Sequence, residues 1–212
     1  MALRTRIAPA LLLLALWGIP SARAQEVVDG IAARVENDVI LRSDLRELAA
    51  YQQLVDGKRE PDAQLLERLI DQWIVHVEAD ASRFKRPASA DVDRELDRLK
   101  NGYASAAEFD RRRAQASLSE TGLRRILEEQ LYLSSYLDSR FRPAVQVENA
   151  AVEEYYEKNV VPLTQKKGET PPALESSREM IRELLIQRGI NEQSDRWLKE
   201  RRARLHIEKE IS

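Results

Sequence analysis

The amino-acid sequence predicts a mainly α-helical protein with a small β-hairpin near its N-terminus and a C-terminal strand that can join the hairpin. Large apolar residues recur at three- and four-residue steps over Pro61–Phe84, Leu118–Phe141 and Glu175–Ala203. This is the spacing of one face of a helix. Period-two alternation appears in short stretches within Val27–Leu41 and Leu205–Glu208, so strands are expected to form a minor part of the fold.

The first elements are the hairpin and a helix that follows it directly. Within Val27–Leu41, the Glu-Asn-Asp sequence at residues 36–38 supplies the turn between two apolar runs. Ser43 is expected to cap the next helix, with Asp44 near its positive end. This helix should stop before Gly57.

The central region predicts further helices. Pro61 opens the first long helix at a position that needs no N–H donor. A shorter helix after it closes at Asn101-Gly102, where a left-handed terminator is expected. Capping boxes occur at residues 105–108 and 117–120, and the second begins the next long helix.

The C-terminal third is expected to hold two helices separated by a linker. Residues 148–159 are predicted to be helical, and the last long helix covers 175–203. Residues 160–174 contain three prolines and a Lys-Lys-Gly sequence. We predict that this segment has no regular structure of its own, although connections of this length are uncommon inside compact domains.

The composition excludes several classes of protein. Hydrophobic residues make up 43% and charged residues 33% of the 212 residues, which suits a packed core with a charged surface. The formal net charge of −2 argues against a nucleic-acid binder. The chain has no cysteine, so disulfides, Cys-ligated metals and thiol nucleophiles are excluded. Glycine numbers only 7, and no nucleotide-binding Gly-rich motif occurs.

The first 24 residues are typical of a cleavable export signal. Arg4 and Arg6 precede an apolar run at residues 7–17, and Ala22-Arg23-Ala24 forms a small-x-small cleavage site. A membrane anchor is the alternative, but the run is short for about 30 Å of hydrocarbon. We therefore expect cleavage before Gln25, with the mature chain at 25–212 outside the cytoplasm.

Few residues are suited to metal or covalent chemistry. His76 and Asp80 share a helix face, but no third or fourth metal ligand is indicated. The simpler interpretation is a partly buried histidine with an acidic neighbour. The sequence G-x-S-x-G does not occur in the mature chain. We expect no catalytic residue, no cofactor and no metal.

The order of the motifs resembles a known chaperone family. Residues 28–45 read Val-Asp-Gly-Ile-Ala-Ala-Arg-Val-Glu-Asn-Asp-Val-Ile-Leu-Arg-Ser-Asp-Leu, and a Leu-Glu-Arg-Leu-Ile-Asp-Gln sequence follows at 66–72. With the long helix at 123–141 and the segment 147–156, this series is similar to the SurA and PpiD family of periplasmic chaperones. The resemblance covers nearly all of residues 25–212 and implies a SurA N-terminal-like helical module.

One departure from the family concerns catalysis. Family members commonly carry parvulin-type prolyl isomerase domains before the last helix, where this chain has only residues 160–174. A domain usually needs at least about 50 residues. The histidines of a parvulin site also have no counterpart between Val77 and Leu205. The resemblance thus implies the chaperone module without the isomerase.

The implied function is ATP-independent binding of unfolded or partly folded envelope proteins, chiefly outer-membrane proteins. Two alternatives stay open. One is a parvulin-related prolyl isomerase with a degenerate site, and the other is a structural subunit that docks one envelope partner. No nucleic-acid partner and no stable membrane insertion after signal cleavage are expected.

The apolar stripe of the last helix becomes thin between Gln187 and Asp195, where Ile190 is the one large apolar residue and Gly189 weakens the helix. We interpret this as incomplete packing that leaves a crevice for clients beside Ile190. The expected ends of the groove are Met180 and Trp197. The aromatic residues expected opposite are Tyr132, Tyr136 and Phe141. Plain core packing is the alternative for each of these side chains.

Overall fold

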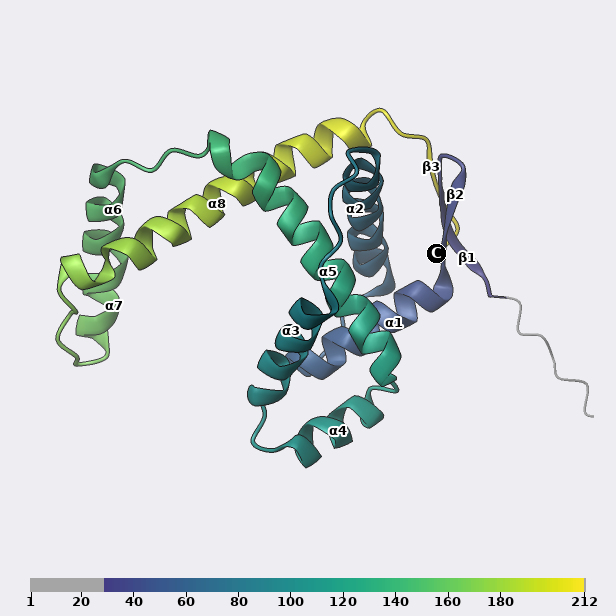
Figure 1. Ribbon diagram of the computed structural model, residues 1–212, viewed down its shortest axis with the longest axis horizontal. Helices are drawn as coiled ribbons and strands as arrows, with labels where there is room; N and C mark the ends of the chain where they lie inside the picture. Colours follow the sequence, from purple (N-terminus) through teal and green to yellow (C-terminus); the bar gives the residue numbers. More distant parts are fainter. Residues whose placement is uncertain (1–28, 212) are drawn as a thin grey trace, which may run out of the picture.

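The computed structural model describes residues 29–211 and confirms a mainly helical fold with a small three-stranded antiparallel sheet (Figure 1). In chain order the elements are β1 (Ile31–Val35), β2 (Asp38–Leu41), α1 (Arg42–Asp56), α2 (Asp62–Ala81), α3 (Ser89–Asn101), α4 (Ala106–Gln115), α5 (Glu120–Phe141), the 3-10 turn η1 (Arg142–Ala144), α6 (Asn149–Tyr155), the π-turn η2 (Tyr156–Val160), α7 (Val161–Lys166), α8 (Leu174–Arg202) and β3 (Ile207–Lys209). The expected export signal at 1–24 lies outside the described residues. No helix within 29–211 is long and apolar enough to cross a membrane.

The sheet joins the two ends of the described chain, as the alternating C-terminal residues predict. Its strand order is β2-β1-β3, and β1 is antiparallel to both neighbours. Val35 faces Asp38 in β2 and Ile207 in β3. An irregular register between Ile31 and Ala33 lets consecutive residues of β1 face the core. The hairpin thus gains the third strand that an isolated two-stranded unit lacks.

Two apolar clusters lie between the sheet and the first five helices. The first joins β1, β2, α1 and α2, and the second joins α1, α3, α4 and α5. Trp197 and Leu198 of α8 pack against the first cluster from outside. The Trp73 indole nitrogen donates a hydrogen bond of 3.0 Å to the Asp38 carboxylate and so links α2 to the hairpin. We call residues 29–141 and 190–211 the body.

The remaining elements form a second region, which we call the arm (residues 149–188). It consists of α6, η2, α7 and the N-terminal half of α8, and Figure 1 shows it extending away from α1, α3 and α4. The prediction that residues 160–174 have no regular structure is wrong for 160–166, because α7 continues from α6 through the π-turn, and for 174, which begins α8. Pro162 lies in the first turn of α7, directly after the π-turn, and it has no N–H to donate to the preceding turn.

Several helix ends differ from the prediction. Ser105 caps α4 as expected, accepting a 3.1 Å hydrogen bond from the Glu108 N–H. Ser117 does not cap α5. It lies at φ +57° because it terminates α4, and Ser119 caps α5 instead. Gly102 is not left-handed. At α1, the Asp44 carboxylate, and not Ser43, accepts the N–H of the residue before the helix.

Candidate functional site

The arm holds three of the six exposed large apolar side chains of the described residues, including the two most exposed, Met180 and Leu163. Met180 on α8 is 67% exposed and Leu163 on α7 is 56% exposed, and Leu184 on α8 is 45% exposed. Met180 and Leu184 are four residues apart, so they share one face of α8. We call these three residues the arm surface. Single exposed apolar side chains are common on protein surfaces, whereas a group of them on one region is a candidate contact surface.

The construction of the arm explains this exposure. On its buried side, Ile181 of α8 and Val152 of α6 are both almost fully covered. Ser177 is also buried, and its small side chain lets α6 lie close to α8. Arg182 of α8 donates a 2.6 Å hydrogen bond to Asn149 at the start of α6. The arm is therefore a thin layer of short helices along α8 (Figure 1), and Met180 and Leu184 remain exposed on another face of this helix within residues 29–211.

The arm is joined to the body by an ion-pair cluster. Arg142 of η1 contacts Asp138 of α5 at 2.8 Å and Glu183 of α8 at 2.6 Å. The hydrogen bonds to Glu183 and Asp138 raise the pKa of the Arg142 guanidinium. The same guanidinium lowers the pKa of Glu183. All three groups are partly exposed, so the cluster contributes to the position of α8 more than to stability.

Close backbone packing provides a second connection. A methyl group added at Gly189 of α8 would lie 2.6 Å from Cγ1 of Val145. Only glycine permits this approach, so Val145 fills the space that the thin stripe of α8 leaves. The adjacent Ile190 is 1% exposed. The prediction of a crevice beside Ile190 is therefore wrong, because Gly189 marks a close contact with Val145 and not a gap.

The six residues predicted to line a client groove do not form one groove. Met180 lies on the arm, about 25 Å along the helix axis from Trp197 at 1.5 Å per residue. Ile190, Tyr132 and Tyr136 are buried, the last two in an apolar cluster between α2 and α5. These three belong to the core. Of the six, Met180 is the one that remains strongly exposed.

Phe141 and Trp197 meet where α5 crosses α8. Their ring centroids are 5.9 Å apart in an edge-to-face arrangement. The Arg140 guanidinium lies 5.0 Å from the centroid of the Trp197 ring and donates a 2.9 Å hydrogen bond to the Tyr136 hydroxyl. Edge-to-face pairs and cation–π contacts of this kind stabilise a helix crossing. These aromatic residues therefore fix α8 to the body.

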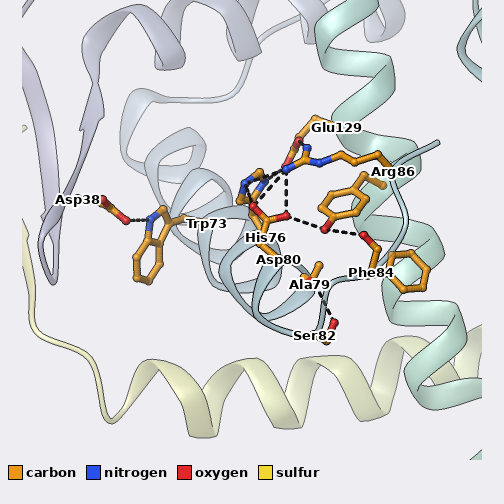
Figure 2. A network of polar contacts seen from close by, with 10 residues as sticks. Asp38, Trp73, His76, Ala79, Asp80, Ser82, Phe84, Arg86 and Glu129 are labelled. Atoms are coloured by element: carbon orange, nitrogen blue, oxygen red, sulfur yellow. Dashed lines mark hydrogen bonds and ion pairs between the residues drawn. The ribbon is translucent and has the colours of Figure 1, made fainter. Parts of the chain in front are cut away.

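Figure 2 shows a polar network between α2 and α5. The His76 ring lies between two carboxylates: Nδ1 is 2.6 Å from Glu129 and Nε2 is 3.1 Å from Asp80. Arg86, from the loop after α2, contacts Asp80 at 3.0 Å and Glu129 at 3.4 Å. Its guanidinium also lies 4.1 Å from the centroid of the Tyr132 ring. The network thus ties the loop and both helices together.

The titration properties of the network fit a structural role. Tyr132 donates a 2.7 Å hydrogen bond to Asp80. Burial, with the nearby Asp80 carboxylate, raises the pKa of the Tyr132 hydroxyl to about 12. The hydrogen bond from Tyr132 lowers the pKa of Asp80. The interpretation of His76 as a partly buried histidine beside an acid is confirmed, while Glu129 and Arg86 are partners that the sequence spacing did not indicate.

Metal binding has no support in the described part of the chain. Within residues 29–211, no group of three or more His, Cys, Asp or Glu side chains has a geometry suited to a metal ion. In the network, the Arg86 guanidinium compensates both carboxylates that face His76. The arrangement therefore functions as an ion-pair cluster.

No protein-family model and no curated protein matches this chain. The resemblance to the SurA and PpiD family therefore depends on the order and spacing of the sequence motifs alone.

Proposed function

We propose that this protein is an ATP-independent periplasmic chaperone that binds unfolded or partly folded envelope proteins, chiefly outer-membrane proteins. The observation that carries the proposal is the arm surface. Its three large apolar side chains project from a region that has its own small buried side and is attached to a stable body. An unfolded chain offers apolar side chains of many kinds, and non-directional apolar contacts accept them without sequence specificity.

The size of the arm surface favours weak and reversible binding. Full burial of one Leu or Met side chain contributes about 1.5–3 kcal/mol, and these residues are already partly covered. The binding free energy of three such contacts is reduced by the entropy that a flexible client loses when it is ordered. The remainder corresponds to a micromolar or weaker complex. A client held this weakly dissociates without an energy source, which suits a compartment that lacks ATP.

The sequence supports the location and the absence of catalysis. The export-signal pattern at residues 1–24 favours secretion across the inner membrane. We expect no prolyl isomerase activity, because residues 160–174 are too few to form the parvulin-type domain that catalyses prolyl isomerisation in the SurA and PpiD family. Uncatalysed isomerisation takes tens of seconds or longer, so even modest catalysis by the purified protein would be visible.

Aggregation suppression tests the proposal. We would dilute a urea-unfolded outer-membrane β-barrel protein into buffer and follow light scattering with and without the chaperone. The double variant Met180→Ser with Leu184→Ser should lose most of the suppression. Val55→Ser is the matched control, because Val55 is 43% exposed on α1 of the body. Equal suppression by both variants, or none by the wild-type protein, would contradict the proposal.

A further inference from the structure

A cavity of about 260 Å³ opens between α1, α2 and α5 of the body. Its apolar lining comes from Leu48, Leu69 and Ile126, one residue from each helix. Leu48 is buried, whereas Leu69 and Ile126 are half-buried and accessible from the opening. Pockets for drug-sized ligands occupy about 300–1,000 Å³, so this cavity suits a single side chain better than a larger molecule.

The rim of the cavity has an excess of negative charge. Asp44, Glu47 and Glu129 each contribute a carboxylate. Arg125 pairs with Glu47, and Glu129 also contacts His76 and Arg86 of the polar network, so the lining keeps a smaller excess of negative charge than its three carboxylates alone would give. Each carboxylate oxygen can accept further hydrogen bonds beyond its partner in the chain. This arrangement attracts a cation and disfavours an acidic group.

An amide side chain adds a feature that suits a peptide. Gln72 of α2 also lines the cavity. An amide group can both donate and accept, as a backbone peptide group does. The apolar floor, the acidic rim and the amide therefore match three parts of an extended peptide segment.

We propose that this cavity binds a client segment in which an apolar side chain is followed, two positions later, by Lys or Arg. In an extended segment, side chains two residues apart point to the same side and lie about 6.6 Å apart. The apolar side chain enters the cavity, and the long cationic side chain reaches the carboxylates of Asp44, Glu47 and Glu129. The inference rests on the proposed chaperone function and gives it a second contact with a stated preference, separate from the arm surface.

Peptide binding tests the preference on the unmodified protein. Three peptides of serine and glycine, each labelled with fluorescein, contain the sequence Leu-Ser-Arg, Leu-Ser-Glu or Ser-Ser-Arg. Their binding to the protein is measured by fluorescence anisotropy at low ionic strength. We expect Leu-Ser-Arg to bind about tenfold more tightly than either other peptide, with the advantage over Leu-Ser-Glu shrinking as salt is added. Equal affinities for Leu-Ser-Arg and Leu-Ser-Glu would overturn the proposal.

Charge reversal then tests the location. Glu47→Lys should weaken Leu-Ser-Arg binding about tenfold and improve Leu-Ser-Glu binding. Asp97→Lys is the control, since Asp97 is exposed on α3 and the change in net charge is the same. Wild-type affinity in Glu47→Lys, or an equal loss in Asp97→Lys, would contradict the assignment.

A second measurement keeps the test decisive if Glu47→Lys is unstable. Because the chain has no cysteine, Gln130→Cys, at another residue of the cavity lining, places a single thiol there and keeps Gln72. A Leu-Ser-Arg peptide with one added cysteine, activated as its 2-pyridyl disulfide, should form a disulfide with this thiol, releasing pyridine-2-thione, several-fold faster than with Asp97→Cys, whereas the corresponding Leu-Ser-Glu peptide should not. Equal labelling rates would refute the site.

Aggregation assays on the same samples separate the two proposals. Suppression without any peptide preference removes the cavity proposal and leaves the chaperone. Selective labelling without suppression removes the chaperone and leaves a peptide-binding cavity.

Discussion

The arm half of α8 has more large apolar residues than the body half, and yet it leaves more of them exposed. In the body, Ile190 is buried and Trp197 packs on the aromatic rings and apolar clusters of the body. In the arm, Ile181 is buried against α6, while Met180 and Leu184 on another face of the same helix remain exposed. Because the more apolar half is the more exposed one, the exposure follows the number of neighbouring layers and does not follow the hydrophobicity of the helix. We infer that the body provides stability and that the arm provides the contact surface.

The largest expected loss of stability comes from the body half of α8. Ile190→Ser removes a buried aliphatic side chain and places a hydroxyl among apolar neighbours. We expect a loss of about 4 kcal/mol in the free energy of unfolding. In contrast, Met180→Ser should change it by less than about 0.5 kcal/mol. Urea unfolding of both variants measures the difference, and similar losses would refute the distinction between the two halves.

Removal of the C-terminal strand should have the next largest effect. Deletion of Arg204–Ser212 removes β3 and the packing of Leu205, Ile207 and Ile211 on the first apolar cluster. Three partly buried side chains at about 1 kcal/mol each predict a loss of about 3 kcal/mol. Thermal unfolding followed by circular dichroism should show a lower melting temperature. An unchanged melting curve would show that the sheet does not hold the body together.

The boundary between arm and body depends on a close contact. Gly189→Ala would place a methyl group 2.6 Å from Val145, so α8 or the segment after η1 must shift. Overpacking of this kind costs about 1–3 kcal/mol. The double variant Gly189→Ala with Val145→Ala should recover part of the loss. If Gly189→Ala is as stable as the wild type, the contact does not fix the arm.

The network between α2 and α5 predicts a specific pH dependence. Tyr132 is 1% exposed, and its pKa rises from 10.0 to about 12 on folding. Its contribution is therefore complete below pH 10 and is lost as the pH rises through 12. Tyr132→Phe should be less stable than the wild type at pH 8 by about 2 kcal/mol, through loss of the hydrogen bond to Asp80. Urea unfolding at pH 8 and pH 11.5 should show this gap narrowing, and a constant gap would contradict the assignment.

The sequence predicts the body better than the arm. Regular apolar spacing identified the three long helices, and alternation at Leu205 and Ile207 indicated the strand that joins the chain ends. Spacing cannot show whether a helix face has a covering layer, so it did not separate exposed Met180 from buried Ile190. Nor did it explain Gly189, because a close approach depends on Val145, a residue distant in sequence.

The polar network illustrates the same restriction. His76 and Asp80 are one helical turn apart, so their proximity follows from the sequence. Glu129 lies on a different helix, 53 residues later, and Arg86 on a loop. Their approach to His76 requires the packing of α2 against α5, which local patterns do not contain.

Site-specific photo-crosslinking tests the central claim most directly. The chain has no cysteine, so Met180→Cys and Val55→Cys each provide a single thiol for labelling with a benzophenone. Position 180 lies on the arm surface, and position 55 is an exposed apolar site of the body. Each labelled protein is mixed with an outer-membrane β-barrel protein that has just been diluted out of urea, and the mixture is then illuminated. We predict strong crosslinks to the unfolded client from position 180, few from position 55, and none to the folded client. Equal yields from both positions would contradict the assignment of client binding to the arm.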